Sequence, residues 1–414
     1  MAFKLKRQKN ENPEPTEPLW TKNFSLIWVM NFSLVAWAFM LTASFPFYII
    51  HLGGNELIAG ITAAGFGLTS LIMRPLAGWM LDNRSRSGVL RVSLILMLLC
   101  SLLYLITPFL LIAVILRVSS GFLLSGAATS TVTSAADAIP KKRFGEGIGF
   151  LGMGNTMGTA IGPVIGLTLI ASLGFRSLFI ACSAVVLVAV LLERGLKYKD
   201  VKKAERIKKA EAGKQIGKKE KIRLGTLFNK DAMPASVVTM FLSAPLAGIS
   251  TFIALYGQIY GIGNGGLYFM LIAAGTGSTR ILAGRIVDSI GEKPIILTGA
   301  GFHFFSMLLL WPQTSILYYL SGLFVGIGFG LSTPSMQAMS MRIIPPEKRG
   351  SATSTFQCAF DVSSALGGIS SGLLVTLAGY RNMFAILSVY SIIALLVYFL
   401  WASKTPSAFN RKIK

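Results

Sequence analysis

Runs of about 20 mostly apolar residues recur along the whole chain, with short polar segments between them. A run of that length is what one helix needs to cross the hydrocarbon core of a bilayer, where every backbone polar group has to be bonded within the chain. We therefore expect an all-α membrane protein with twelve transmembrane helices. The predicted spans lie near residues 24–50, 57–81, 89–107, 109–136, 145–171, 177–194, 233–257, 266–287, 295–311, 315–341, 351–378 and 382–402.

The composition supports this prediction. Residues of the set AVILMFWYC make up 53% of the chain, charged residues make up 14%, and the mean hydropathy is +0.64. A soluble domain carries about 25% charged residues. The net charge of +22 does not indicate nucleic acid as a partner, because Lys and Arg form short clusters between the apolar runs, as membrane topology requires.

No residue pattern indicates an enzyme or a metal site. The three cysteines lie in apolar runs and show neither metal-ligand spacing nor a CxxC pair. No nucleophile–base pair or phosphate-binding loop is recognisable. We expect no enzymatic activity, no metal and no cofactor.

Basic residues mark one side of the predicted helices. They cluster before the first span, after the second and fourth, around the end of the tenth and in the C-terminal tail, whereas the loops on the other side carry chiefly Arg176 and Arg381. Because positive charge stays in the cytoplasm, we expect a multi-pass protein of the plasma membrane with both termini inside.

The expected organisation has five parts. A cytoplasmic tail at 1–23 precedes a six-helix bundle at 24–194, a basic linker at 195–231 leads to a second six-helix bundle at 232–402, and 403–414 forms a cytoplasmic tail. Two interpretations of the linker remain open: a helix that binds anionic lipids of the cytoplasmic leaflet, or a solvated connection.

The two predicted bundles are related in sequence. Shifts of 205 or 206 positions align three pairs of segments: Arg74–Asp82 with Arg280–Asp288, Pro140–Arg143 with Pro346–Arg349, and Gly174–Phe179 with Gly379–Phe384. All three pairs fall at equivalent loops. Duplicated six-helix halves are typical of secondary transporters.

The loop after the second span reads GWMLDNRSR, and the second half repeats it as GRIVDSIG. Both resemble the G-x-x-x-D-[RK]-x-G-[RK] loop of the major facilitator superfamily, from which Asn83 and Ser85 depart. The resemblance extends from Trp20 to Trp401. It implies a transporter whose halves are held together at the cytoplasmic face by an aspartate at a helix N-terminus; the gating residues of these loops are Gly78, Asp82, Arg86, Gly284 and Asp288.

Two features near the fourth span add to the resemblance. Arg117, followed by Gly121, matches the family's arginine-then-glycine pattern. A buried arginine in a membrane costs several kcal/mol unless it meets a partner or a wet cavity, so it indicates either function or a structural pair. Asp137 lies in the loop after this span, and we expect it to join Arg86 in a gating network of ion pairs.

The fifth span carries the most specific motif. Gly158-x-x-x-Gly162-Pro163-x-x-Gly166 resembles the G-x-x-x-G-P-x-x-G motif of the family's proton-antiporting exporters. With Gly154, these glycines recur every fourth residue and form one stripe, against which a neighbouring helix can pack closely. Pro163 removes a backbone donor and bends the helix. The resemblance implies efflux by antiport, as in multidrug resistance.

A few titratable residues lie within the predicted spans. Asp361 lies near mid-membrane, and we expect it to carry the coupled proton, with Arg117 biasing its pKa or the substrate site. Its repeat partner is Asn155. Arg74 and Arg280 lie about 12 Å into the membrane; they either line the substrate cavity with Asn155 or extend toward the cytoplasm.

These observations favour a proton-coupled exporter of small molecules that works as a monomer, with the proton gradient as its energy source. An uptake symporter for a sugar or another nutrient is the alternative within transport, and a non-transporting membrane sensor or scaffold is the alternative outside it. The first span contains no acidic residue that could attract a cationic drug. We therefore expect a neutral, zwitterionic or anionic substrate rather than a quaternary ammonium drug.

Overall fold

The computed structural model describes residues 18–83, 86–106, 108–140, 143–196, 229–344, 349–406 and 408. Within these ranges the chain is helical and contains no strand, which confirms the all-α prediction. The helices of the first half are α1 (Lys22–His51), α2 (Glu56–Asn83), α3 (Arg86–Leu103), α4 (Leu110–Ala138) and α5 (Phe144–Arg194). Those of the second half are α8 (Met233–Ile259), α9 (Gly265–Ile290), α10 (Glu292–Leu309), α11 (Ser315–Met341), α12 (Arg349–Leu387) and α13 (Val389–Leu400).

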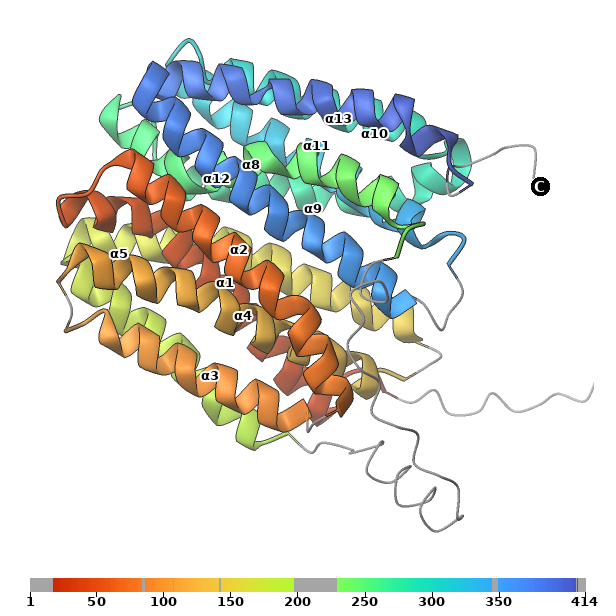
Figure 1. Ribbon diagram of the computed structural model, residues 1–414, viewed down its shortest axis with the longest axis horizontal. Helices are drawn as coiled ribbons and strands as arrows, with labels where there is room; N and C mark the ends of the chain where they lie inside the picture. Colours follow the sequence, from red (N-terminus) through yellow and green to blue (C-terminus); the bar gives the residue numbers. More distant parts are fainter. Residues whose placement is uncertain are drawn as a thin grey trace, which may run out of the picture.

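The two halves form two lobes that lie side by side, with their helices running roughly along one direction (Figure 1). Helix α1 begins and α13 ends at the same end of the molecule. We call this end the terminal face and the other end the far face. Most of the predicted linker, residues 197–228, lies outside the described residues.

Two glycines divide the longest helices. Gly174 in α5 has φ 78° and Gly379 in α12 has φ 75°, backbone conformations that glycine adopts without steric cost. Each glycine therefore marks a sharp reversal, so α5 comprises two arms and the end of α12 continues into α13. The reversals separate the predicted spans 145–171 from 177–194 and 351–378 from 382–402. Counted this way, the described residues give six helical segments to each lobe.

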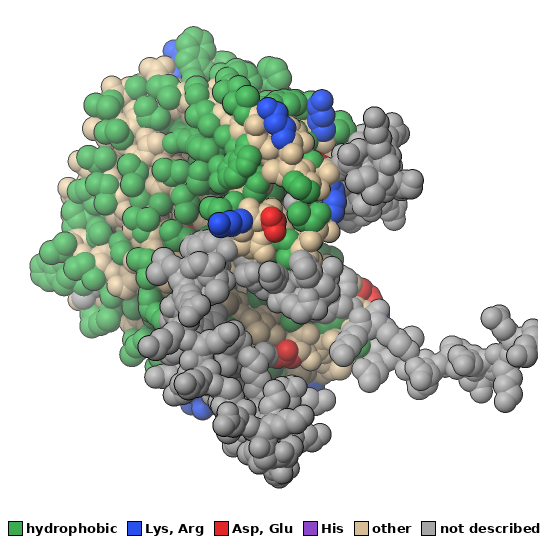
Figure 2. Space-filling model, turned by 45° about the vertical axis from the view of Figure 1, so that its right-hand side comes forward, with side chains coloured by type: hydrophobic (Ala, Val, Ile, Leu, Met, Phe, Trp, Pro, Cys, Tyr) green, Lys and Arg blue, Asp and Glu red, His purple; other side chains and the backbone are tan. Residues whose placement is uncertain are grey.

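The outside of the molecule is apolar. Ile316 and Leu377 are 80% and 73% exposed, and hydrophobic side chains are spread over the part of Figure 2 that is not drawn in grey. Seven helical stretches are long and apolar enough to cross a bilayer. Many buried hydroxyls are bonded within their own helices, as when Ser101 Oγ donates to the Met97 carbonyl at 2.9 Å. This is the arrangement that a hydrocarbon environment requires.

Candidate functional site

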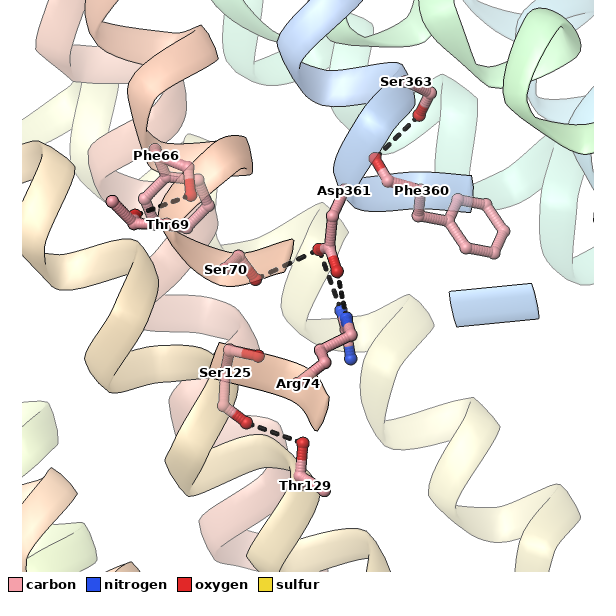
Figure 3. A network of polar contacts seen from close by, with 9 residues as sticks. All are labelled: Phe66, Thr69, Ser70, Arg74, Ser125, Thr129, Phe360, Asp361 and Ser363. Atoms are coloured by element: carbon pink, nitrogen blue, oxygen red, sulfur yellow. Dashed lines mark hydrogen bonds and ion pairs between the residues drawn. The ribbon is translucent and has the colours of Figure 1, made fainter. Parts of the chain in front are cut away.

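A buried ion pair joins the two halves. Asp361, on α12, accepts hydrogen bonds from Arg74 Nε and from Arg74 Nη2, the latter at 3.0 Å. Ser70, one turn before Arg74 on α2, donates to Asp361 Oδ1 at 3.0 Å. The Arg74 and Asp361 side chains are 20% and 8% exposed. Figure 3 shows both α2 side chains pointing across the seam at the one carboxylate.

Small residues bring α2 and α12 close enough for this contact. A Cβ built on Gly67 would lie 2.7 Å from the Asp361 carbonyl oxygen. Nearer the far face, a Cβ on Gly60 would lie 2.6 Å from the Gly368 carbonyl oxygen and 2.7 Å from the Gly372 Cα. Since these contacts are with backbone, only glycine fits here without moving a helix. The short Ser70 and Asp361 side chains can then meet between the helices.

Arg117 lies elsewhere, in the interior of the first half. It is 3% exposed on α4. Its Nη2 donates to Thr42 Oγ1 of α1 at 2.7 Å, and its guanidinium carbon lies 4.4 Å from the Phe66 ring centroid. Nη1 is buried without a hydrogen-bond partner. The contacts recorded for Arg117 thus stay within the first half, and the residue joined to Asp361 is Arg74.

The glycine stripe of α5 packs on α1 within the same half. Cβ atoms built on Gly158 and Gly162 would lie 2.8 Å from Val35 Cγ1 and 2.5 Å from the Ala36 carbonyl oxygen. The remaining stripe glycines, Gly154 and Gly166, also face α1 side chains or backbone. Pro163 lies inside the helix next to this contact.

The two other predicted cavity residues lie at the second seam between the halves, formed by α5 and α9. The Asn155 side chain is exposed on α5, and its Oδ1 accepts a hydrogen bond from Asn31 Nδ2 at 2.6 Å. Arg280 of α9 reaches α5, where a Cβ built on Gly152 would lie 3.4 Å from Arg280 Nη2. The structure therefore pairs Arg74 with Asp361 at one seam and places Arg280 beside α5 at the other.

The predicted gating residues are only partly described. Gly78 and Asp82 fall in α2, Arg86 begins α3, and Gly284 and Asp288 fall in α9, but the structure describes only the backbone at these five positions. Asp137 is exposed near the end of α4. Among the described residues, no three His, Cys, Asp or Glu side chains cluster as metal ligands do.

Sequence reasoning missed Ser70 and Thr42, the hydroxyl partners of Asp361 and Arg117. Ser70 precedes Arg74 by four residues, so helical spacing puts both on one face. That spacing could have grouped the two residues, but it does not say which helix lies opposite. Thr42 carries no comparable signal, because a threonine in an apolar helix commonly bonds to its own backbone, as Thr42 also does to the Ala38 carbonyl.

Comparison with known proteins covers nearly the whole chain. The family model described as Major Facilitator Superfamily matches residues 27–316 and 266–414. An uncharacterised transporter of this type from Methanocaldococcus jannaschii is 24% identical, over 92% of this chain and 98% of its own. The staphylopine export protein of Staphylococcus aureus is 23% identical over 84% and 88%, and the multidrug resistance protein MdtG of Citrobacter koseri is 26% identical over 89% and 91%.

Solved structures share the architecture. A D-xylose–proton symporter aligns with a TM-score of 0.73 at 15% identity, over 92% of this chain and 97% of that one. The nucleoside transporter NupG aligns with a TM-score of 0.71 at 15% identity, over 93% and 100%. At these identities the likeness concerns the fold alone.

Proposed function

The chain belongs to the Major Facilitator Superfamily and is a multi-pass membrane transporter of small molecules; we propose that it is a proton-coupled exporter. The observation that carries the proposal is the ion pair between Arg74 and Asp361, which bridges the two halves inside the membrane. A buried ion pair is costly to break by removing one charge alone. It therefore holds the halves together for as long as Asp361 is ionised.

Protonation of Asp361 cancels that charge. A neutral carboxyl keeps one hydrogen bond to Arg74 or Ser70 but loses the Coulomb attraction, so the α2–α12 seam loosens. A substrate that binds between the halves and weakens this pair has the same effect. The empty, ionised transporter stays closed at this seam, whereas the proton-bound and substrate-bound forms can change conformation. A transporter that cannot return empty exchanges one ligand for the other, which is antiport.

Two observations support export over uptake. The Gly158–Gly166 motif of α5 resembles that of the family's antiporting exporters, and it packs directly on α1. Two of the relatives are named for export or multidrug resistance. The proposal places the basic terminal face, and with it both termini, in the cytoplasm. In this proposal, Asp82 and Asp288 form a cytoplasmic latch and the 195–231 linker binds anionic lipids. The transporter works as a monomer and needs no cofactor.

Everted membrane vesicles test the proposal. We expect vesicles containing the transporter to accumulate some members of a radiolabelled small-molecule panel when a proton gradient is imposed, and to stop when a protonophore collapses it. Asp361→Asn should abolish gradient-driven accumulation, because asparagine cannot bind and release a proton, while gradient-free exchange of the same compound continues. Asp231→Asn, at an exposed position before α8, is the matched control.

Two results would contradict the proposal. Gradient-driven accumulation that persists in Asp361→Asn would remove this carboxylate from coupling. Accumulation in right-side-out vesicles, driven by inward proton flow, would instead establish uptake symport.

A further inference from the structure

The sequence repeat relates the two seams between the halves. A shift of 206 positions places Arg280 at the position equivalent to Arg74, and Asn155 at the position equivalent to Asp361. The α2–α12 seam therefore carries an arginine and a carboxylate, and the α5–α9 seam carries an arginine and an amide. The duplication has kept the cation at both seams but the anion at only one.

At the second seam, Arg280 lies against the helix that carries Asn155. The Arg280 guanidinium lies against α5 at Gly152, where a Cβ would be 3.4 Å from Nη2 and 3.6 Å from Cζ. Asn155 lies three residues further along α5, on the same side of that helix. Because Asn155 Oδ1 accepts from Asn31 Nδ2, its amide group is held in place and its own N–H donors are left for another acceptor.

Arg74, Arg117 and Arg280 differ in the groups that surround their charges. Arg74 has the Asp361 carboxylate, and Arg117 is enclosed by Thr42 and aromatic rings in the interior of one half. Among the described residues, Arg280 has no carboxylate partner. A cation held inside a membrane without an opposite charge is costly, and such residues face a partner or a route for ligands. Arg280 lies between the halves, against α5.

We propose that Arg280 and Asn155 form an anion subsite for the transported molecule, and that the molecule is an organic carboxylate. A guanidinium offers two parallel N–H donors that match a carboxylate, and the Asn155 amide adds a further donor. The guanidinium lies beside α5 at Gly152. This inference rests on the proposed function, in that the ligand is the exported substrate. The proton and the substrate then occupy different seams, and each binds where both halves contribute.

Equilibrium binding to the purified full chain tests this. The probes are matched pairs of a carboxylic acid and its amide, with aliphatic, aromatic and amino-acyl chains, and the measurement is the ligand concentration that raises the unfolding temperature in detergent. We expect the wild-type protein to bind at least one acid about tenfold or more tightly than its amide. Arg280→Gln should remove that preference, since the amide-bearing probe does not depend on the guanidinium charge.

Asn155→Asp is the sharper variant. It recreates the repeat partner and places a carboxylate beside Arg280, so it should abolish acid binding while the protein stays folded. Arg176→Gln, an exposed arginine on α5, should keep the acid preference. No acid preference in the wild type, or a preference that survives Arg280→Gln, would overturn the proposal.

These results are separable from those for export. Binding at equilibrium needs neither a gradient nor a direction, so acid selectivity can be found in a protein that takes up its substrate. Gradient-driven export of neutral compounds only, without acid selectivity, would uphold the exporter and reject the carboxylate subsite.

Discussion

At the scale of single residues, buried charges in this protein are stabilised by short polar side chains as well as by opposite charges. Arg117 illustrates this, because its recorded hydrogen-bond partner is the Thr42 hydroxyl. A guanidinium over an aromatic face gains about 2 kcal/mol when desolvated, and Phe66 supplies such a face at 4.4 Å. Thr42 supplies the hydrogen bond that the guanidinium makes in addition to this ring contact.

We therefore expect Thr42→Val to destabilise the protein, because it leaves a second N–H group of Arg117 buried without a partner. An unsatisfied buried group costs about 1–3 kcal/mol. Thr133→Val is the control, since Thr133 donates only to the Thr129 carbonyl of its own helix. Unfolding of both variants in detergent provides the measurement. Equal stability of the two variants would show that the Thr42 contact contributes nothing.

At the scale of helices, the sequence predicted the elements better than their contacts. The twelve apolar runs and the repeated Gly174 and Gly379 segments predicted the spans and the reversals between them. Asp361 was expected to carry the proton, and Arg74 either to line the cavity or to extend toward the cytoplasm. Their pairing was not predicted, because 287 residues separate them. Helical periodicity says which residues share a face and leaves open which helix covers it. For the same reason Arg117 was expected to act on Asp361 or on the substrate site, whereas its contacts lie in the first half.

The α5 stripe allows a clean test of helix packing. In Gly162→Ala the new Cβ would lie 2.5 Å from the Ala36 carbonyl oxygen and 3.1 Å from the Met40 nitrogen. Because backbone atoms of α1 cannot move aside singly, we expect a loss of about 1–3 kcal/mol in stability and reduced transport.

Gly149→Ala, on the same helix, is the control for that variant. A Cβ there meets nothing within 4 Å, and alanine favours a helix over glycine by about 0.5–1 kcal/mol. The unfolding temperature should therefore fall in Gly162→Ala and rise in Gly149→Ala, and transport should fall only in Gly162→Ala. Loss of function in both would mean that α5 needs glycine for its flexibility rather than for packing.

At the scale of the whole molecule, the far face is closed differently at its two seams. Along α2 and α12 the backbones touch through Gly60, Gly368 and Gly372, and the Tyr380 hydroxyl donates to Glu56 Oε1 at 3.3 Å. On the α5 side, a cavity of about 810 Å³ opens between the halves, lined by α1, α5, α8 and the start of α9. The contact of Gly60 with Gly368 and Gly372 therefore closes the far face, and α2 and α12 must separate there for that face to open.

Gly60→Ala should accordingly shift the protein toward conformations with an open far face. The added Cβ would lie 2.6 Å from the Gly368 carbonyl oxygen and 2.7 Å from the Gly372 Cα, so the closed seam is destabilised by about 1–3 kcal/mol, and about 1.4 kcal/mol is a tenfold change in population.

The separation of the lobes can be measured between spin labels on Leu173→Cys and Ile316→Cys, in a background without the natural cysteines. Both sites are exposed, at 70% and 80%. We expect the longer-distance population to rise about tenfold with Gly60→Ala and to stay unchanged with Gly301→Ala, whose Cβ meets nothing within 4 Å. An unchanged distance distribution in Gly60→Ala would show that this backbone contact does not keep the far face closed.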